Sequence, residues 1–167
     1  MADRDLIARE LSQLEEPLRA LIKRADHFAC WQMKTKGALA PGYWAIDRER
    51  KLTVVPQPSD NKDTSVALIR ALFEMMGVEC YVFLGESWIL EQKNAPDLQE
   101  LRDISDHPER KEVVILIAES ASSGMIIGSR AIIRTQRKPR LGPLRLKRYP
   151  HVEGRMSSLL PRTGMQS

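Results

Sequence analysis

The amino-acid sequence predicts an α+β domain in which helices pack on one face of an antiparallel sheet of about five or six strands. Two segments, residues 7–25 and 66–76, carry apolar side chains at helical spacing. Between and after them come short runs rich in aromatic and β-branched residues, separated by turn signals. The resulting order of elements is α, β, β, α, β, β, β, β.

The length of the chain, 167 residues, corresponds to about one domain with a core that needs no disulfides. We expect residues 1–150 to form this domain and residues 151–167 to be a basic C-terminal tail, loosely docked or disordered. Two cysteines are too few for a disulfide framework, and no apolar run is long enough to cross a bilayer. These features favour a cytoplasmic protein without a membrane partner.

An N-terminal helical segment is expected over residues 4–28, with Pro17 producing a kink or dividing it into two short helices, the second starting near Glu16. This segment either packs on its own domain or joins copies of the chain into a homo-oligomer through residues 7–25. Its apolar stripe consists of Ile7, Leu11, Leu14, Leu18, Leu21 and Ala25.

A hairpin follows, with strands near residues 43–46 and 52–55 that end at two prolines. Side-chain oxygens of Ser59, Asp60 and Asp63 are suited to capping the next helix, and Gly77 stands where a left-handed C-terminal cap is needed. The helix between them has an apolar face, formed by Val66, Ile69, Leu72, Phe73 and Met76.

Residues 80–90 have strand composition, and Gly85 within them indicates a bulge or a close approach of another group to the backbone. Residues 93–110 are expected to form a long surface loop. Residues 112–118 and 125–133 predict a second hairpin, and residues 141–149 a last strand after a basic turn at 136–140.

Charge is divided unevenly along the chain. Residues 130–167 hold ten basic residues and one acid, a local net charge of +9, whereas residues 1–129 hold sixteen basic and twenty-one acidic residues, or −5. A concentrated positive surface attracts anionic partners. The division therefore predicts a binding site for polyanions near the C-terminal end.

We interpret this region as a basic β-ribbon that contacts an acidic protein or nucleic acid. Two alternatives stay open: the arginines protect edge strands from pairing, or they pair with acids of residues 97–119 in this chain or in a partner. The candidate anion-binding residues are Arg130, Arg134, Arg137, Lys138, Arg140, Arg145 and Lys147.

A small hydrolase-like enzyme is the alternative function. His107 lies in a polar cluster before a predicted strand, and it could act with Glu109 or Glu86 as acid and base, with Ser87 as nucleophile. The sequence around Ser87 lacks the second glycine of a nucleophile elbow. The sequence therefore assigns no catalytic residue, and a binding module is preferred to an enzyme.

No metal or cofactor is expected. His27 and Cys30 have the spacing of a ligand pair, but no second paired motif follows, as structural zinc sites require. The phosphate-binding loop, the dinucleotide-binding glycine motif and the zinc-protease motif do not occur in the sequence.

Three pieces of the chain resemble a group of uncharacterised bacterial and phage proteins. They are the strand Tyr81–Trp88, the loop His107–Glu112, and the tail from Gly154–Met156 to Leu159–Arg162. The resemblance implies a shared domain and carries no activity, cofactor or site residue with it.

Overall fold

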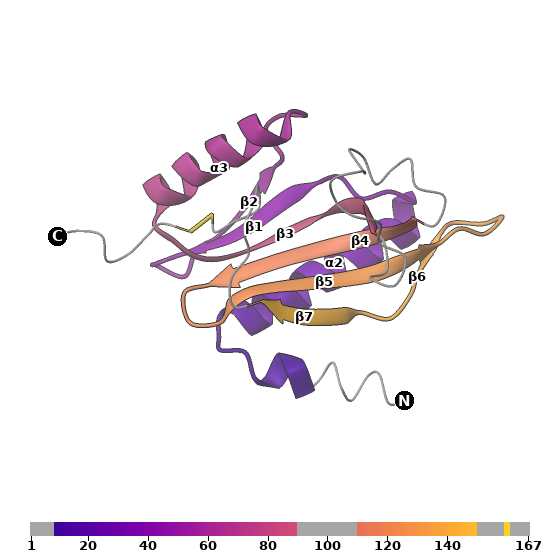
Figure 1. Cartoon of the computed structure of the whole chain (residues 1–167), viewed down its shortest axis with the longest axis horizontal. Helices are drawn as coiled ribbons and strands as arrows, with labels where there is room; N and C mark the ends of the chain where they lie inside the picture. Colours follow the sequence, from indigo (N-terminus) through magenta and orange to yellow (C-terminus); the bar gives the residue numbers. More distant parts are fainter. Residues whose placement is uncertain (1–8, 90–109, 150–158, 161–167) are drawn as a thin grey trace, which may run out of the picture.

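The computed structural model describes residues 9–89, 110–149 and 159–160 (Figure 1). The named elements are α2 (Leu18–Lys36), β1 (Gly42–Asp47), β2 (Leu52–Pro56), α3 (Lys62–Met76), β3 (Val78–Ile89), β4 (Lys111–Ser120), β5 (Gly124–Ile133), β6 (Arg140–Leu141) and β7 (Arg145–Tyr149).

The strands form one antiparallel sheet in the order β2-β1-β3-β4-β5-β6, and β7 also pairs with β5. Strands β3, β4 and β5 are the longest and make up the centre of the sheet (Figure 1). Both predicted hairpins, β1–β2 and β4–β5, are present. The predicted α+β fold class is therefore confirmed.

The two long helices lie on opposite faces of the sheet, whereas one helical face was expected. Tyr43 packs in the cluster that contains α3, and its neighbour Trp44 packs against the cluster that contains α2. Successive side chains of a strand point to opposite faces, so one strand serves two cores. Residues 80–84 of β3 and 113–118 of β4 are continuous apolar runs for this reason, and such runs indicate burial on both faces.

The N-terminal segment consists of two helical pieces. This is one of the two arrangements expected at Pro17, the other being a single kinked helix. Residues 9–12 are helical, and α2 begins after Pro17 and continues to Lys36, beyond the expected end at residue 28. The apolar stripe residues in the described part are buried in the core of this chain. They are Leu11, Leu14, Leu18, Leu21 and Ala25.

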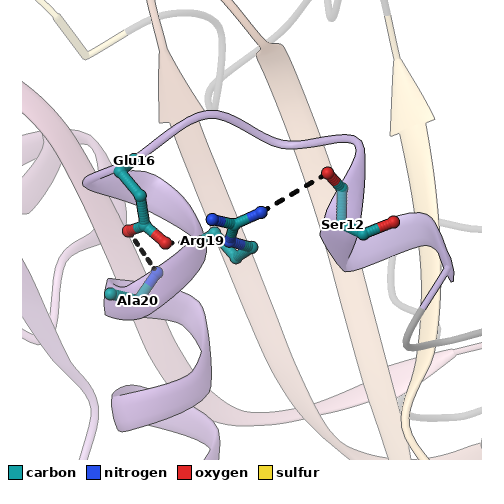
Figure 2. A network of polar contacts seen from close by, with 4 residues as sticks. All are labelled: Ser12, Glu16, Arg19 and Ala20. Atoms are coloured by element: carbon teal, nitrogen blue, oxygen red, sulfur yellow. Dashed lines mark hydrogen bonds and ion pairs between the residues drawn. The ribbon is translucent and has the colours of Figure 1, made fainter.

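Glu16 supports the start of α2 (Figure 2). Its carboxylate accepts a hydrogen bond from the backbone N–H of Ala20 at 3.1 Å and another from Arg19 Nε at 2.8 Å. Arg19 also donates to the carbonyl oxygen of Ser12, which connects the two helical pieces. The hydrogen bond from Arg19 lowers the pKa of Glu16, so the carboxyl stays charged beside the positive end of the helix.

The ends of α3 are capped by two residues. Asn61 Oδ1 accepts a hydrogen bond from the backbone N–H of Thr64, so the cap is Asn61 and not Ser59, Asp60 or Asp63. Gly77 has a φ of 65° and forms the predicted left-handed C-terminal cap.

Strand β3 runs without interruption through Gly85, and its register with β4 is continuous there. The register shift falls instead between Ile46 and Asp47 of β1. A Cβ on Gly85 would lie 3.1 Å from the Phe83 ring and 3.6 Å from Pro41. Of the two expectations for Gly85, the close approach is the one that the structure shows.

The last predicted strand is divided into β6 and β7 by Gly142, Pro143 and Leu144. Proline has no N–H to donate to a ladder, which separates the two pairing segments. Farther along the chain, Leu159 is buried in the cluster around α3, and its N–H donates to Glu119 Oε1 at 3.2 Å. This part of the predicted tail is docked.

Candidate functional site

Five of the predicted anion-binding cations are exposed along one border of the sheet, and we call this surface the basic edge. It comprises the connection from β5 to β6, which projects from the sheet in Figure 1, together with β6 and β7. Both short strands pair with the same long strand, β5, one after the other. These five are Arg137, Lys138, Arg140, Arg145 and Lys147. Arg148 of β7 is exposed as well, and its Nε donates to the carbonyl oxygen of Ser123 at 2.8 Å.

The strand register places three of these cations on a single face. Arg140 is opposite Ile133, Arg145 is opposite Ser129, and Lys147 is opposite Ile127. Residues directly opposite on paired strands project to the same side, and the three β5 partners are separated by even numbers of residues. The face is the one that carries α3, and neighbouring cations on β7 are about 7 Å apart along the strand.

Arg130, a predicted anion-binding residue, lies on the other face and is engaged. Its Nε and Nη2 donate to the two carboxylate oxygens of Asp26 at 2.7 Å each, and its Nη1 donates to the carbonyl oxygen of Gly142 at 2.9 Å. The hydrogen bond with Asp26 raises the pKa of Arg130. The arginine joins α2, β5 and the β6–β7 connection.

Arg134 has the same orientation and is also engaged. It donates to both carboxylate oxygens of Glu112 on β4, and Glu86 on β3 lies 4.0 Å from its Nη2. All three residues stand at positions that face the α2 side of the sheet. Two members of the predicted anion-binding set thus already bind carboxylates of this chain, through acids that are far away in the sequence.

The remaining cations differ in their contacts. Lys138 Nζ donates to the carbonyl oxygen of Thr35 at 2.6 Å, which ties the β5–β6 connection to the end of α2. Within the described residues, no ion pair involves Arg137, Arg140 or Arg145. These three guanidinium groups are open to an external anion.

The predicted catalytic candidates are not brought together by the described residues. His107 and Glu109 lie outside the described part of the chain. Glu86 and Ser87 are consecutive in β3, so their side chains project to opposite faces, and Glu86 is directed to Arg134. A nucleophile and a base must converge on one substrate, and this pair does not.

His27 and Cys30 lie on α2 beside an open groove of about 910 Å³ that the sequence did not indicate. The groove also contains the pair Asp26 and Arg130. Among the described residues, no three histidines, cysteines, aspartates or glutamates are grouped so that they could hold a metal ion.

Both cysteines are free. Burial raises the pKa of Cys30, and it raises the pKa of Cys80 to about 11. Both groups are therefore held as neutral thiols at neutral pH, and neither has the low pKa of a reactive cysteine.

A second cavity, of about 470 Å³, lies at the N-terminal end of α3. Sequence reasoning missed it because its walls come from four separate elements. One signal was present in the sequence. Ser65 stands next to Val66 on the apolar side of the α3 pattern, where its hydroxyl group is buried. A buried hydroxyl group needs a hydrogen-bond partner, so its position points to a polar spot in the core.

Comparison with known proteins does not assign the chain to a family: no family model, no curated protein and no solved structure matches it. In the described part of the chain, each helix is too short or too polar to span a bilayer.

Proposed function

We propose that the chain is a cytoplasmic binding module whose basic edge receives an extended acidic segment of another protein. The observation that carries this proposal is the placement of Arg140, Arg145 and Lys147 on one face of neighbouring edge strands. Exposed cations in a row supply attraction and orientation to an extended anionic chain.

The backbone of β7 supports a polypeptide partner. Within the described residues, β7 pairs with β5 alone, so its outer side offers N–H and C=O groups to an added strand. Strand addition to a sheet edge supplies main-chain hydrogen bonds, and side chains at alternate positions supply specificity. An acidic residue at every second position would meet the cations of β7.

The side chains around the cations also favour a protein over a nucleic acid. Ile133 is 43% exposed next to Arg140, so the surface is partly apolar. Tyr149, the last residue of β7, is the one aromatic residue from 133 to 149, so bases would have few side chains on which to stack. A polypeptide with alternating acidic and apolar side chains matches both features.

The test uses a labelled short peptide of alternating glutamate and valine, with labelled single-stranded and duplex DNA as competing probes. We expect the peptide to bind, and its affinity to fall as salt is added. The triple variant Arg137→Glu, Arg140→Glu and Arg145→Glu should lower peptide affinity by about tenfold or more, because each pair contributes up to about 1 kcal/mol. Fluorescence anisotropy gives both affinities.

The matched control is the triple variant Arg24→Glu, Arg48→Glu and Lys51→Glu, which changes the net charge equally at exposed positions away from the basic edge. Its peptide affinity should stay within about twofold of the unmodified chain. An equal loss in both variants would show that only net charge matters. Tighter binding of either DNA than of the peptide at the same salt concentration would replace the protein partner with a nucleic acid.

A further inference from the structure

The cavity at the N-terminal end of α3 has the size and lining of a small-molecule site. Its volume is about 470 Å³, within the range of about 300–1,000 Å³ that is usual for ligand pockets. The walls are mainly apolar and come from β1, β3, β4 and α3. They include Tyr43, Val66, Phe83, Ile115 and Ile117.

Rigid neighbours hold these walls in place. The Tyr43 ring is 4.9 Å from the Phe83 ring and 6.0 Å from the Phe73 ring, measured between centroids. Phe73 is completely buried in the α3 cluster. Packed aromatic side chains of this kind keep a cavity open, because collapse would disrupt the surrounding core.

A buried hydroxyl marks one end of the cavity. Ser65 lines it and is only 2% exposed, and its Oγ makes no hydrogen bond of normal geometry. It interacts weakly with the Tyr43 hydroxyl: burial raises the pKa of Tyr43, and Ser65 offsets part of that rise. The N–H of Ser65 is already used, since it donates to the carbonyl oxygen of Asn61. Buried polar groups are almost always hydrogen-bonded, so a hydroxyl without a normal hydrogen bond in a cavity wall indicates that a ligand supplies the acceptor.

A cation also lines the cavity, while Glu86, the one acidic residue of its lining, lies 4.0 Å from Arg134. Lys62 lines the cavity from the first turn of α3, and no ion pair within the described residues involves Lys62. The partial positive charge of a helix N-terminus adds to that of the ammonium group. An anion that accepts hydrogen bonds fits this end, and an apolar body fits the other walls.

We propose that this cavity binds a small monocarboxylate with an aromatic or branched apolar body. The carboxylate accepts a hydrogen bond from Ser65 Oγ and pairs with Lys62, while the body packs against Phe83, Ile115 and Ile117. This site is separate from the basic edge and does not depend on the function proposed for it.

The experiment compares phenylpropionate with its uncharged amide, phenylpropionamide, by titration of backbone amide chemical shifts in NMR. We expect phenylpropionate to shift the amides of residues that line the cavity. The amide analogue should bind about tenfold more weakly, because it has no negative charge to pair with Lys62 or to strengthen the hydrogen bond from Ser65.

Two variants and one control assign the contacts. Ser65→Ala removes a buried hydroxyl without a normal hydrogen bond and leaves the fold intact, and it should weaken phenylpropionate binding about tenfold. Lys62→Gln should weaken it about threefold to tenfold and leave the amide analogue unchanged. Lys51→Gln, at an exposed position outside the cavity, should change neither affinity.

The proposal is overturned if phenylpropionate shifts no cavity residue. It is also overturned if Ser65→Ala and Lys62→Gln bind phenylpropionate as the unmodified chain does. Equal binding of the acid and its amide would exclude the carboxylate contact. None of these results bears on peptide binding at the basic edge, so the two proposals fail independently.

Discussion

Asp26 and Arg130 form the most buried ion pair among the described residues, with side chains that are 18% and 20% exposed. Removing charged groups from water is costly, and the pair recovers that cost only because two parallel hydrogen bonds and the Gly142 carbonyl satisfy the guanidinium. Arg140 and Arg145 carry the same charge but remain exposed. Position in the sheet therefore decides which arginine supports the fold and which can meet a partner.

Replacing Arg130 with methionine should destabilise the protein. The change leaves the Asp26 carboxylate without its partner in a mostly buried place, and we expect the free energy of unfolding to fall by about 2–3 kcal/mol. Urea denaturation at neutral pH measures this. The double variant Asp26→Leu and Arg130→Met should recover most of the loss, and Arg145→Met should change stability by less than about 0.5 kcal/mol. Equal effects of Arg130→Met and Arg145→Met would contradict this role for the pair.

At the scale of the elements, α3 and β3 are joined by one residue. Gly77 ends the helix with φ at 65°, and Val78 begins the strand. The left-handed conformation reverses the chain at once, and this brings Phe73 of the helix against Tyr81 of the strand, with ring centroids 5.2 Å apart. The geometry of one residue sets how α3 lies on the sheet.

Substituting Gly77 should weaken this junction. A Cβ at this position would have room, since the nearest atom is Arg48 Nε at 3.4 Å, so the cost arises from the backbone conformation. We expect Gly77→Ala to lower the free energy of unfolding by about 1–2 kcal/mol. Gly77→Asn should cost less, because asparagine tolerates the left-handed region. Thermal or urea unfolding gives both values, and equal costs for the two variants would contradict the argument.

At the scale of the whole molecule, the C-terminal region closes the core around α3. Leu159 is 1% exposed and lies in the same cluster as Tyr43, Ile69 and Phe73. The hydrogen bond from its N–H to the buried Glu119 holds this part of the chain against β4. Residues that are more than a hundred positions apart, from Tyr43 to Leu159, therefore share one core cluster.

Leu159→Ala should reduce the stability of this cluster. The truncation leaves a cavity in a buried site, and a loss of about 2–4 kcal/mol in the free energy of unfolding is expected. Hydrogen exchange should show faster exchange of α3 amides. Val54→Ala, at a position that is 53% exposed on β2, should have little effect. Unchanged α3 exchange in Leu159→Ala would show that the C-terminal contact is dispensable.

The sequence alone determined most of the local structure. Helical spacing predicted both helical regions, proline and glycine marked where elements end, and alternation placed Arg145 and Lys147 on the same face of their strand. These predictions succeed because they depend on neighbours within a few residues. The uneven charge of the chain also follows from sequence. The cap at Asn61 and the division of the last strand were missed, because several neighbouring residues can cap a helix or end a strand and the sequence does not choose among them.

Only the tertiary structure decided which of the predicted anion-binding cations already pair with a carboxylate of this chain. Arg130 meets Asp26 across 104 positions of the chain, and Arg134 meets Glu112 across 22. The placement of α2 and α3 on opposite faces, and the cavity beside Ser65, likewise depend on strand order and register. Contacts between distant residues are set by how the strands pair. An alternating side-chain pattern shows that two residues of a strand lie on the same face of the sheet, but it does not show which other residues pack on that face.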